Sequence, residues 1–357
     1  MDHIGSIATF AQRMRLISRS CYLEIERKIM MRPFRKKFFL IMLLGLVASS
    51  FGGTANAAAP ALQLSVSGKL VKSELSPIAV GGSVLVPLRT VSDALGATLS
   101  FTASTNTATI GKWQTSVALT AGSGIAKVTR WTQEPAELKL TSVPKIINGR
   151  MYVPIRFLSE TFGYVVYYSG GTVFIRPPIN PADQATLTSG SLEDARQLMI
   201  KLVFGSALRS EPEPLKPNHT SEYYGFSYLF PRGEALRFYY FEDDTVRWIE
   251  YREGFLVATY QARLNEDDPV RLFLQGKWTE ARGSTPSPGK DGFYYYSYGY
   301  SGDNREESSG QVDAGGKLDV TAYYRKYGPP ELNIGQIAYS LPGEARAERV
   351  KIDVPQV

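Results

Sequence analysis

The sequence predicts an α+β fold in two parts. The first is a twisted antiparallel sheet around short helices, built from two repeat units, and the second is an α+β domain with an antiparallel meander. Three observations support this prediction. A motif recurs once at a fixed offset of 67 positions, short runs of β-branched and aromatic residues alternate with glycine-containing turns, and only a few segments space their apolar residues as a helix does.

The leader, residues 1–57, is predicted to contain a secretory signal peptide. A basic segment is followed by the apolar run Phe38–Ala48 and by small residues that end at Ala57, the three-part pattern of such a signal. A membrane-spanning helix needs about 20 apolar residues, so this run is too short to remain as an anchor. We therefore expect cleavage after Ala57, a secreted or cell-wall-associated protein, and contact with the membrane only during export. Because the residues before Met30 and Met31 resemble neither a domain nor a signal, we expect translation to begin at one of these methionines.

Most of the unusual composition of the chain lies in this leader. Its nine basic and three acidic side chains account for the whole formal charge of +6, and the remaining residues carry 31 basic and 31 acidic groups. The single cysteine, Cys21, and His3 also lie in the leader, which leaves His219 as the one histidine of the mature chain. A disulfide framework, a thiolate metal site and a His-rich metal centre are thereby excluded. We expect no cofactor, and the neutral mature chain argues against nucleic-acid binding.

An internal repeat organises the first mature domain, residues 58–178. Segments 77–96 and 144–163 share Pro, Gly, Val-Pro, Arg, Ser and a final Gly at the same relative positions. Gly81 and Asn148, each followed by glycine, tolerate positive φ angles. Each unit is therefore predicted to begin with a tight turn between two short strands.

Each unit then contains one short helix. Apolar residues recur at helical spacing over Leu88–Leu95 and Ile155–Phe162. Pro87 and Pro154 are predicted at the first helical position, where a missing N–H costs nothing. A glycine follows each helix, as it does at many helix C-termini. Helices this short are unstable alone in water, so we expect their apolar sides to pack against a sheet.

The strands of that sheet are predicted from segments with β-branched or alternating character. They are Leu62–Val66, Val84–Val86, Thr98–Thr102, Thr107–Ile110, Ser116–Leu119, Tyr152–Val153, Val165–Tyr168 and Thr172–Ile175. With the two helices they complete the predicted α+β repeat domain.

Two arginines on the predicted helices leave two interpretations open. Arg89 stands four residues before Asp93, and Arg156 stands four residues before Glu160, so each pair can meet on a helix surface. In the first interpretation these are solvated ion pairs worth about 0.3 kcal/mol each. In the second interpretation the arginines bind a carboxylate.

The doubled motif resembles a known family. A glycine-bearing turn, Val-Pro-Leu-Arg or Val-Pro-Ile-Arg, a short helix, an extended strand and Thr-x-Thr-Ile are similar to the copper amine oxidase N-terminal-like domain, also called the stalk domain, over about Leu62–Pro178. The resemblance implies a twisted antiparallel sheet around a helix, found in secreted and envelope-associated proteins of Gram-positive bacteria. It also implies an appendage without an active site, which is the role of this part in the namesake oxidase. The segment Arg130–Leu140 departs from the usual spacing, and the Trp-Asp that often ends the strand after the helix is missing.

Copper amine oxidation itself is not predicted. In the oxidase that chemistry needs three histidines on copper and a tyrosine within Thr-x-x-Asn-Tyr-Asp/Glu that becomes the quinone cofactor. The mature chain keeps one histidine, His219, and contains no such tyrosine motif. We therefore expect that the chain is not a copper amine oxidase.

A second domain is predicted over residues 190–357, after a linker at residues 179–189. Prolines at the end of the repeat domain predict a short, stiff, extended exit. Ser191 begins a capping box, and apolar residues at helical spacing predict a helix from there to about Leu208. Three short turns between the following strands predict an antiparallel meander. The predicted strands are Tyr223–Phe230, Ala235–Phe241, Val246–Tyr251, Phe255–Leu264, Val270–Leu274, Phe293–Tyr298, Gly316–Tyr324 and Arg349–Val354, with loops at Gly283–Gly292 and Ser301–Gly310.

Tyrosines concentrate in the second domain and supply the candidate binding residues. Because side chains alternate along a strand, Tyr294, Tyr296, Tyr298 and Tyr300 are expected on one face and Tyr295 on the other. Tyrosine packs well in antiparallel sheets, so an ordinary structural role is one interpretation. The other is an aromatic platform on which the sugar rings of a wall or extracellular polysaccharide stack.

Two acidic clusters, Glu242–Asp244 and Glu266–Asp268, lie at predicted turns. Solvated carboxylates are ordinary at turns. Two carboxylates about 5 to 9 Å apart would instead allow glycoside hydrolysis, and spacing along the sequence does not decide that distance.

The leading hypothesis is a secreted or cell-envelope, non-catalytic binding protein of the stalk or adhesion type. Its second domain would contact a cell-wall or extracellular polysaccharide, or a surface protein. The alternative is a wall-acting glycoside hydrolase that uses carboxylates of the second domain. The sequence contains neither a nucleophile elbow nor a phosphate-binding loop, so no catalytic or metal-binding residue is predicted.

Overall fold

The computed structural model describes residues 62–130, 133–218, 224–264, 268–326 and 332–348, which belong to one compact unit, residues 58–357. The predicted leader, His219 and the predicted strand Arg349–Val354 lie outside the described residues. None of the helices within the described ranges is long and apolar enough to cross a membrane.

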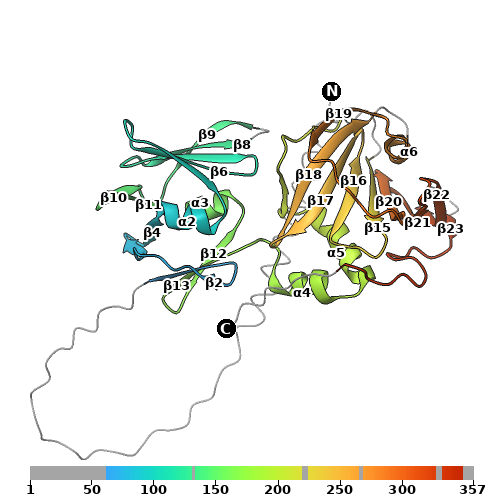
Figure 1. Ribbon diagram of the computed structural model, residues 1–357, viewed down its shortest axis with the longest axis horizontal. Coiled ribbons are helices and arrows are strands. Elements are labelled where there is room, and N and C mark those ends of the chain that lie inside the picture. The colour runs from blue at the N-terminus through green and yellow to red at the C-terminus, as the bar shows by residue number, and fades with distance from the viewer. Residues whose placement is uncertain (1–61, 131–132, 219–223, 265–267, 327–331, 349–357) are drawn as a thin grey trace, which may run out of the picture. The chain divides into compact units, whose positions relative to one another are not determined.

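The repeat domain consists of short strands and two short helices (Figure 1). Its strands are β1 (Gln63–Val66), β2 (Lys69–Leu70), β3 (Ile78–Val80), β4 (Ser83–Pro87), β5 (Thr98–Thr102), β6 (Thr107–Lys112), β7 (Thr115–Thr120), β8 (Ile125–Arg130), β9 (Gln133–Lys139), β10 (Lys145–Ile147), β11 (Arg150–Pro154), β12 (Val165–Ser169) and β13 (Thr172–Arg176), and its helices are α2 (Leu88–Ala94) and α3 (Ile155–Thr161). Every strand and helix predicted for this domain is present. Strands β2, β8 and β9 were not predicted, and β3 and β10 were expected only as short strands, without bounds, before the two tight turns.

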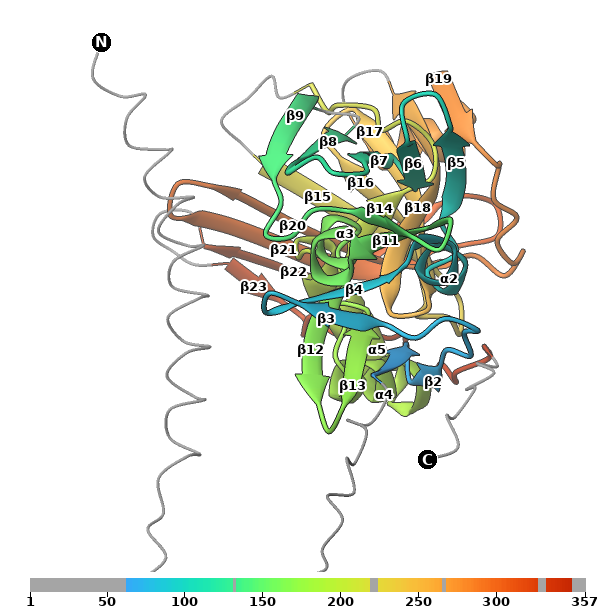
Figure 2. The ribbon, with the colours of Figure 1, turned by 90° about the vertical axis from the view of Figure 1, so that its left-hand side faces the viewer.

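Three small sheets form the repeat domain instead of one wrapped sheet. Their strand orders are β12-β13-β1-β2, β10-β11-β4-β3 and β5-β6-β7-β8-β9. The first and last strands of the domain, β1 and β13, run parallel, so the prediction of a purely antiparallel sheet is wrong at this pair. In Figures 1 and 2, helices α2 and α3 lie between the β5–β9 sheet and the β12-β13-β1-β2 sheet, and residues of both sheets share one apolar core with the helices.

The two units follow the same order of elements and meet about a local two-fold axis. The segments β3-β4-α2-β5 and β10-β11-α3-β12 have element bounds that differ by 67 residues throughout. Strand β4 pairs antiparallel with β11, and Val86 lies opposite Val153, its equivalent at that offset. An antiparallel pair in which a residue faces its own counterpart has two-fold symmetry, as at the interface of a symmetric dimer. The two units therefore pack like two copies of one small subunit joined in a single chain.

Both helices end in the same glycine motif. Gly96 has a φ of 61° and Gly163 a φ of 84°, and the amide of the following residue donates to the carbonyl of Ser92 in the first unit and Ser159 in the second. This is the Schellman arrangement, which needs a left-handed residue that glycine adopts at little cost.

The start of each helix differs slightly from the prediction. Pro87 and Pro154 are the last residues of β4 and β11, and the first helical residue follows them. Both prolines keep extended ψ angles, 125° and 110°, because each pairs across the β4–β11 ladder. The fixed φ of proline suits a strand end as well as a first helical turn, so the sequence locates this boundary only to within a residue.

The second domain is built on one ten-stranded sheet. Its strands are β14 (Leu208–Ser210), β15 (Tyr224–Pro231), β16 (Arg237–Glu242), β17 (Thr245–Arg252), β18 (Phe255–Leu264), β19 (Trp278–Gly283), β20 (Phe293–Ser301), β21 (Asn304–Val312), β22 (Leu318–Lys326) and β23 (Leu332–Ile334), and its helices are α4 (Pro181–Ser189), α5 (Leu192–Val203) and α6 (Pro269–Leu274). The strand order is β14-β18-β17-β16-β15-β20-β21-β22-β23, with β19 paired to β18. Strands β15 to β18 pair in chain order, whereas β14 runs parallel to β18.

Residues 181–189 of the predicted linker form helix α4 instead of extended chain. Asn180 caps this helix by accepting a hydrogen bond of 2.9 Å from the amide of Asp183. Leu187 of α4 and the preceding Ile179 are buried in the core of the second domain. Helix α5 starts after its cap Ser191 as predicted, but it ends at Val203 and not near Leu208.

Val270–Leu274, predicted as a strand, forms most of helix α6. Asp268 caps this helix by accepting a hydrogen bond of 3.1 Å from the amide of Arg271, and Pro269 occupies the first turn. Val270 and Phe273, three residues apart, pack on the sheet. The Asp-Pro pair was a helix-start signal in the sequence, and it prevails over the β-branched Val270.

Ser301–Gly310, predicted as a polar loop, contributes most of strand β21. This strand lies between β20 and β22, so its backbone is paired on both edges. Ser297 and Ser308 share a hydrogen bond of 2.7 Å across one of these pairs. A Cβ on Gly310 would overlap the backbone oxygen of Asp319. The polar composition predicted a loop. The segment is a strand because its contacts are made by the backbone and by small side chains, which leave no hydrophobic pattern in the sequence.

The central sheet has an apolar core on each face. Tyr294 and Tyr296 pack with residues of helices α4 and α5 on one face. Trp248 and Tyr295 pack with Val270 of helix α6 on the other. The predicted alternation along β20 is therefore confirmed, and the middle strands of the sheet are covered on both faces.

A buried ion pair fastens the C-terminal segment to this core. Arg196 of α5 is fully buried and donates to both oxygens of Glu344, at 2.7 and 2.8 Å. Its other donors reach the carbonyls of Pro231, Glu234 and Tyr339. Burial by itself raises the pKa of Glu344, but the hydrogen bonds and charge of Arg196 outweigh burial, and the pKa is lowered. Because each charge has a partner, this pair is structural.

Candidate functional site

The structure places the four candidate tyrosines unevenly. Tyr294 and Tyr296 are 1% and 4% exposed, and burial raises the pKa of both hydroxyls. Tyr294 donates a hydrogen bond of 2.6 Å to the carbonyl of Ala338. Tyr298 is half-buried, and Tyr300 is 36% exposed. The proposed platform is therefore wrong for Tyr294 and Tyr296, because a sugar ring cannot reach side chains inside the core.

The described carboxylates of the acidic clusters hold local structure. At the β16–β17 turn, Glu242 pairs with Arg247 at 2.9 Å and Asp244 pairs with Arg263. In the second cluster Asp268 caps helix α6, and the two residues before it lie outside the described residues. In the part of the chain that the structure describes, no three His, Cys, Asp or Glu side chains lie close enough together to hold a metal ion.

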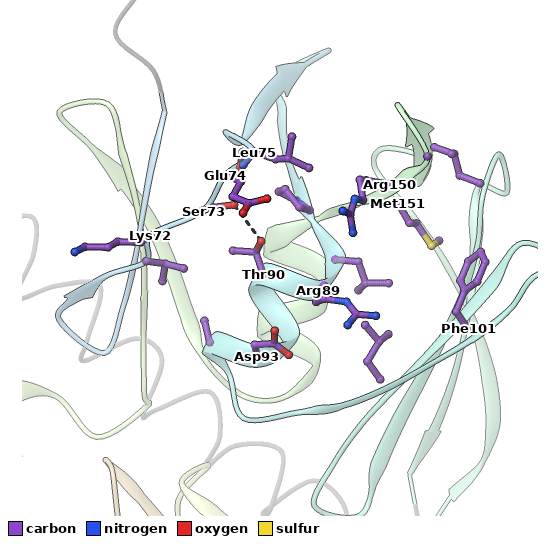
Figure 3. A pocket seen from close by; sticks show the side chains of 17 residues that line it. Lys72, Ser73, Glu74, Leu75, Arg89, Thr90, Asp93, Phe101, Arg150 and Met151 are labelled. Carbon is purple, nitrogen blue, oxygen red and sulfur yellow. Dashed lines mark hydrogen bonds between the residues drawn. The ribbon is translucent and has the colours of Figure 1, made fainter.

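A groove beside helix α2 is a candidate binding site because it combines exposed arginines with an exposed aromatic ring (Figure 3). Its volume is about 550 Å³. The walls come from the start of α2, from strand β5 and from the β10–β11 hairpin, and the segment Val71–Leu75 lines another part. All of these elements belong to the repeat domain.

A small hydrogen-bond network holds the segment Val71–Leu75 against the helix. Oγ of Ser73 lies 3.1 Å from Oγ1 of Thr90, a contact drawn as a dashed line in Figure 3. The same oxygen donates to the carbonyl of Leu75 at 2.7 Å and accepts from its amide at 3.2 Å. Figure 3 shows Lys72 pointing away from α2. The turn at Ser73 thus shapes one wall of the groove without filling it.

Two arginines line the groove without an internal partner. Arg89 lies in the first turn of α2, Arg150 is the first residue of β11, and both are exposed. Among the described residues neither guanidinium makes a hydrogen bond or an ion pair, so the pair that the sequence allows between Arg89 and Asp93 is not formed. Figure 3 shows both arginine side chains extending into the groove. Their donors are therefore available to a ligand.

Apolar side chains form much of the remaining lining. Phe101 of β5 is 50% exposed and Ile146 of β10 is 45% exposed, and Met151 lies beside them. Exposed apolar surface that is rimmed by charged side chains is typical of an interaction site. Asp93 adds a carboxylate to the same lining. The groove therefore offers an aromatic ring, two guanidinium groups and hydrogen-bond acceptors.

The equivalent residues beside helix α3 have different chemistry. Arg156, the counterpart of Arg89, pairs with Glu160 at 3.5 Å. The counterpart of Arg150 is Ser83, and the counterpart of Thr90 is Phe157, which packs against the core. The arginine beside α2 is therefore free to contact a ligand in the groove, whereas the equivalent arginine of α3 is paired with a carboxylate.

Sequence reasoning found Arg89 as a candidate carboxylate ligand but missed Arg150 and Phe101. Arg150 follows a tight turn, and the β4–β11 pairing brings it beside the helix of the other unit. Only the difference from Ser83 at the equivalent position signalled it. Phe101 sits in a strand that reads as ordinary core, and its exposure appears only once the sheets are packed.

The comparisons with known proteins bear on this part of the chain. The model of the copper amine oxidase N-terminal domain family matches residues 65–176. A comparison with curated proteins found no match. The groove residues, from Val71 to Met151, all lie within the matched range. The resemblance expected from the sequence is therefore confirmed, and residues 65–176 match the copper amine oxidase N-terminal domain family.

Proposed function

We propose that this protein is a secreted or cell-envelope binding protein of the stalk or adhesion type, without a catalytic role. In this proposal the groove beside α2 binds a cell-wall or extracellular polysaccharide that carries carboxylates. The observation that carries the proposal is the presence of two unpartnered arginines, Arg89 and Arg150, and the exposed ring of Phe101 in one groove. The binding residues therefore move from the tyrosines of the second domain to the repeat domain.

The arginines support an acidic ligand. A guanidinium presents a planar fork of donors that matches a carboxylate, and such charge-assisted hydrogen bonds are stronger than neutral ones. Arg196 in the second domain donates hydrogen bonds to Glu344 and to backbone carbonyls. Arg89 and Arg150 have no comparable internal contacts among the described residues, so binding a ligand breaks none.

The remaining lining supports a sugar as the carrier of that carboxylate. The C–H face of a sugar ring is apolar and packs on an aromatic side chain such as Phe101. Asp93 and Glu74, which also line the groove, accept hydrogen bonds from hydroxyl groups when ionised. They also reduce the net positive charge of the groove, which favours a ligand with few carboxylates and many hydroxyls.

The alternative, a wall-acting glycoside hydrolase, has less support from the structure. Glu242 and Asp244 of the second domain are engaged by arginines. A general acid or base has to be free to exchange a proton with the substrate. The secreted location rests on the signal-peptide pattern of residues 31–57.

A sedimentation assay on purified cell wall, and on its carboxylate-bearing polysaccharide fraction, tests the proposal. The protein from residue 58 onward is compared with Arg89→Gln, Arg150→Gln and the matched control Arg156→Gln, which changes the equivalent arginine of the other unit. We expect the original chain and Arg156→Gln to bind alike, and each groove variant to bind about tenfold more weakly, the loss expected for one charge-assisted hydrogen bond.

Two further arms identify the ligand group and test the alternative. Amidating the carboxylates of the polysaccharide should abolish the difference between Arg89→Gln and the original chain. Equal binding by all variants would contradict the proposal. So would the release of soluble sugar that disappears on substitution of a single carboxylate of the second domain.

A further inference from the structure

We propose that a second pocket, between the β6–β7 turn and strand β14, binds an oxyanion group, either a phosphate or a carboxylate. This pocket has a volume of about 310 Å³, at the lower end of the range for small-molecule sites. It is separate from the groove beside α2 and shares none of its lining residues. The inference does not depend on the proposed polysaccharide binding.

Among the residues that the structure describes, three arginines and no carboxylate line this pocket. They are Arg130 at the end of β8, Arg209 of β14 and Arg247 of β17. The other lining residues are uncharged: Thr115 carries a hydroxyl group, while Gln114 and Ser210 already donate to the carbonyls of Glu211 and Pro212. A concave site lined by three arginines and by no described acid favours an anion.

Arg209 carries the main argument because its charge is not compensated. Its side chain is half-buried, and burial lowers the pKa of the guanidinium, an effect that Tyr164 partly offsets. Its Nη1 donates to the carbonyls of Ser206 and Leu208, at 2.8 and 2.7 Å, and the group lies over the ring of Trp113. Within the described ranges it has no carboxylate partner. Buried charges in proteins are ordinarily paired.

Comparison with Arg196 shows why the lack of a described carboxylate partner at Arg209 is informative. Arg196 is fully buried, whereas Arg209 is half-buried; both lie over aromatic rings, yet Arg196 has a bidentate carboxylate in Glu344. At Arg209 the described residues supply carbonyl oxygens and aromatic rings but no counter-ion. An oxyanion from solution would complete the same kind of arrangement.

The two other arginines are placed to share such an anion. The guanidinium of Arg130 makes no hydrogen bond or ion pair in the part of the chain that the structure describes. Arg247 pairs with Glu242 at 2.9 Å through Nη1, and its Nη2 makes a contact of 3.4 Å with the carbonyl of Leu215. Arg130 is therefore the most readily redirected donor, and Arg247 contributes mainly charge.

The β6–β7 turn beside the pocket contains a strained backbone conformation, and such strain clusters at functional sites. Trp113 has a φ of 52°, a left-handed conformation that is an outlier for a bulky side chain. Its ring lies 4.7 Å from that of Phe255, and Trp113 and Gln114 of the β6–β7 turn both line the pocket. The packing of this ring stabilises the turn in a shape that its own backbone disfavours.

Unfolding in the presence of inorganic phosphate tests the proposal. The midpoint of thermal unfolding of the protein from residue 58 onward is measured in phosphate, in citrate and in sodium chloride at the same ionic strength, and calorimetric titration gives the affinities. Phosphate or citrate should raise the midpoint above the chloride value, and the tighter of the two identifies the group. The variant Arg130→Gln should weaken binding about tenfold, since it removes one charge-assisted contact.

The controls separate binding at this site from a general loss of charge and from a loss of folding. Arg209→Met keeps an unbranched side chain over Trp113 and should abolish the effect. Arg130→Gln disturbs no internal contact, so its result holds even if Arg209→Met folds poorly. Arg156→Gln, whose arginine lines neither this pocket nor the groove, should bind phosphate or citrate as the original chain does. The proposal is overturned if neither anion exceeds chloride, or if Arg130→Gln binds as tightly as the original chain.

Discussion

Helices α2 and α3 have the same local structure and different surroundings. Both follow a strand that ends in proline, both end in a Schellman motif, and both bury a serine, Ser92 or Ser159, on the inner side. Beside α2 an open groove has two unpaired arginines. Beside α3 the arginine is paired, and Tyr164, directly after the helix, packs on Phe255 of the second domain.

The difference shows that the repeated motif determines the backbone of each unit, while a few residue differences determine whether its helix is exposed or covered. At the position of Ala97 in the first unit the second unit has Tyr164, and at the position of Thr90 it has Phe157. These larger side chains enlarge the apolar surface of the second unit, and the second domain covers part of it. The first unit keeps smaller residues there and leaves its helix accessible.

The largest expected effect is on the covered side. Phe255→Ala removes a buried ring that lies 4.7 Å from the ring of Trp113 and 4.9 Å from that of Tyr164, and should lower the free energy of unfolding by about 3–5 kcal/mol. Phe101→Ala, the matched control in the open groove, should change it by less than about 0.5 kcal/mol. Equilibrium unfolding in urea measures both. Similar losses for the two variants would mean that the two sides do not differ in burial.

The helix-ending glycines should respond unequally to alanine. Gly96→Ala should cost about 1–2 kcal/mol, because alanine disfavours the left-handed conformation. Gly163→Ala should cost about 1 kcal/mol more, since a Cβ there would overlap the guanidinium of Arg209. The same urea titration, repeated in an Arg209→Met background, checks the cause.

In that background the extra cost at Gly163 should disappear while the cost at Gly96 stays. If the extra cost persists without Arg209, contact between the two domains at this point is not its source.

A smaller effect of equal size is expected at the buried serines. Ser92 and Ser159 bury hydroxyl groups that have no hydrogen-bond partner among the described residues. Alanine removes a desolvated polar group and has the higher helix propensity. Ser92→Ala and Ser159→Ala should each raise the free energy of unfolding by about 0.5 kcal/mol. Opposite signs for the two variants would contradict the equivalence of the two helices.

The smallest effects are expected at the surface arginines. Arg156→Gln loses its pair with Glu160 and should lower the free energy of unfolding by about 0.3–0.5 kcal/mol at low salt. Arg89→Gln breaks no internal contact and should leave the free energy of unfolding within error. Thermal unfolding at low and high salt compares them, since only the effect at Arg156 should fade as salt screens the pair. A salt-dependent loss at Arg89 would reveal an internal role for that side chain.

The sequence predicted the elements of the repeat domain well because their signals are local. The glycine turns, the Val-Pro steps and the helix-ending glycines each constrain the backbone within a few residues. Helix α6 shows the limit of such signals: the apolar run Val270–Leu274 suits a strand or a helix, and only the cap at Asp268 decides. Strand β21 shows another, since a polar segment becomes central when its backbone completes the ladder between β20 and β22.

The candidate site was harder to predict because it depends on which segments meet. Tyr294 and Tyr296 were assigned to the correct face of their strand, yet helices α4 and α5 cover that face. The groove combines Arg89 of one unit with Arg150 of the other through the pairing of β4 with β11. Periodicity along the chain identifies a face, but burial of that face depends on distant segments.

Hydrogen exchange with and without the carboxylate-bearing polysaccharide fraction tests the central claim most directly, because it compares the two helices in one sample. We predict slower amide exchange in residues 88–94 and 149–151, and unchanged exchange in residues 155–161. Equal protection of both helices, or protection confined to the tyrosine-rich strand β20, would contradict the assignment of binding to the groove beside α2.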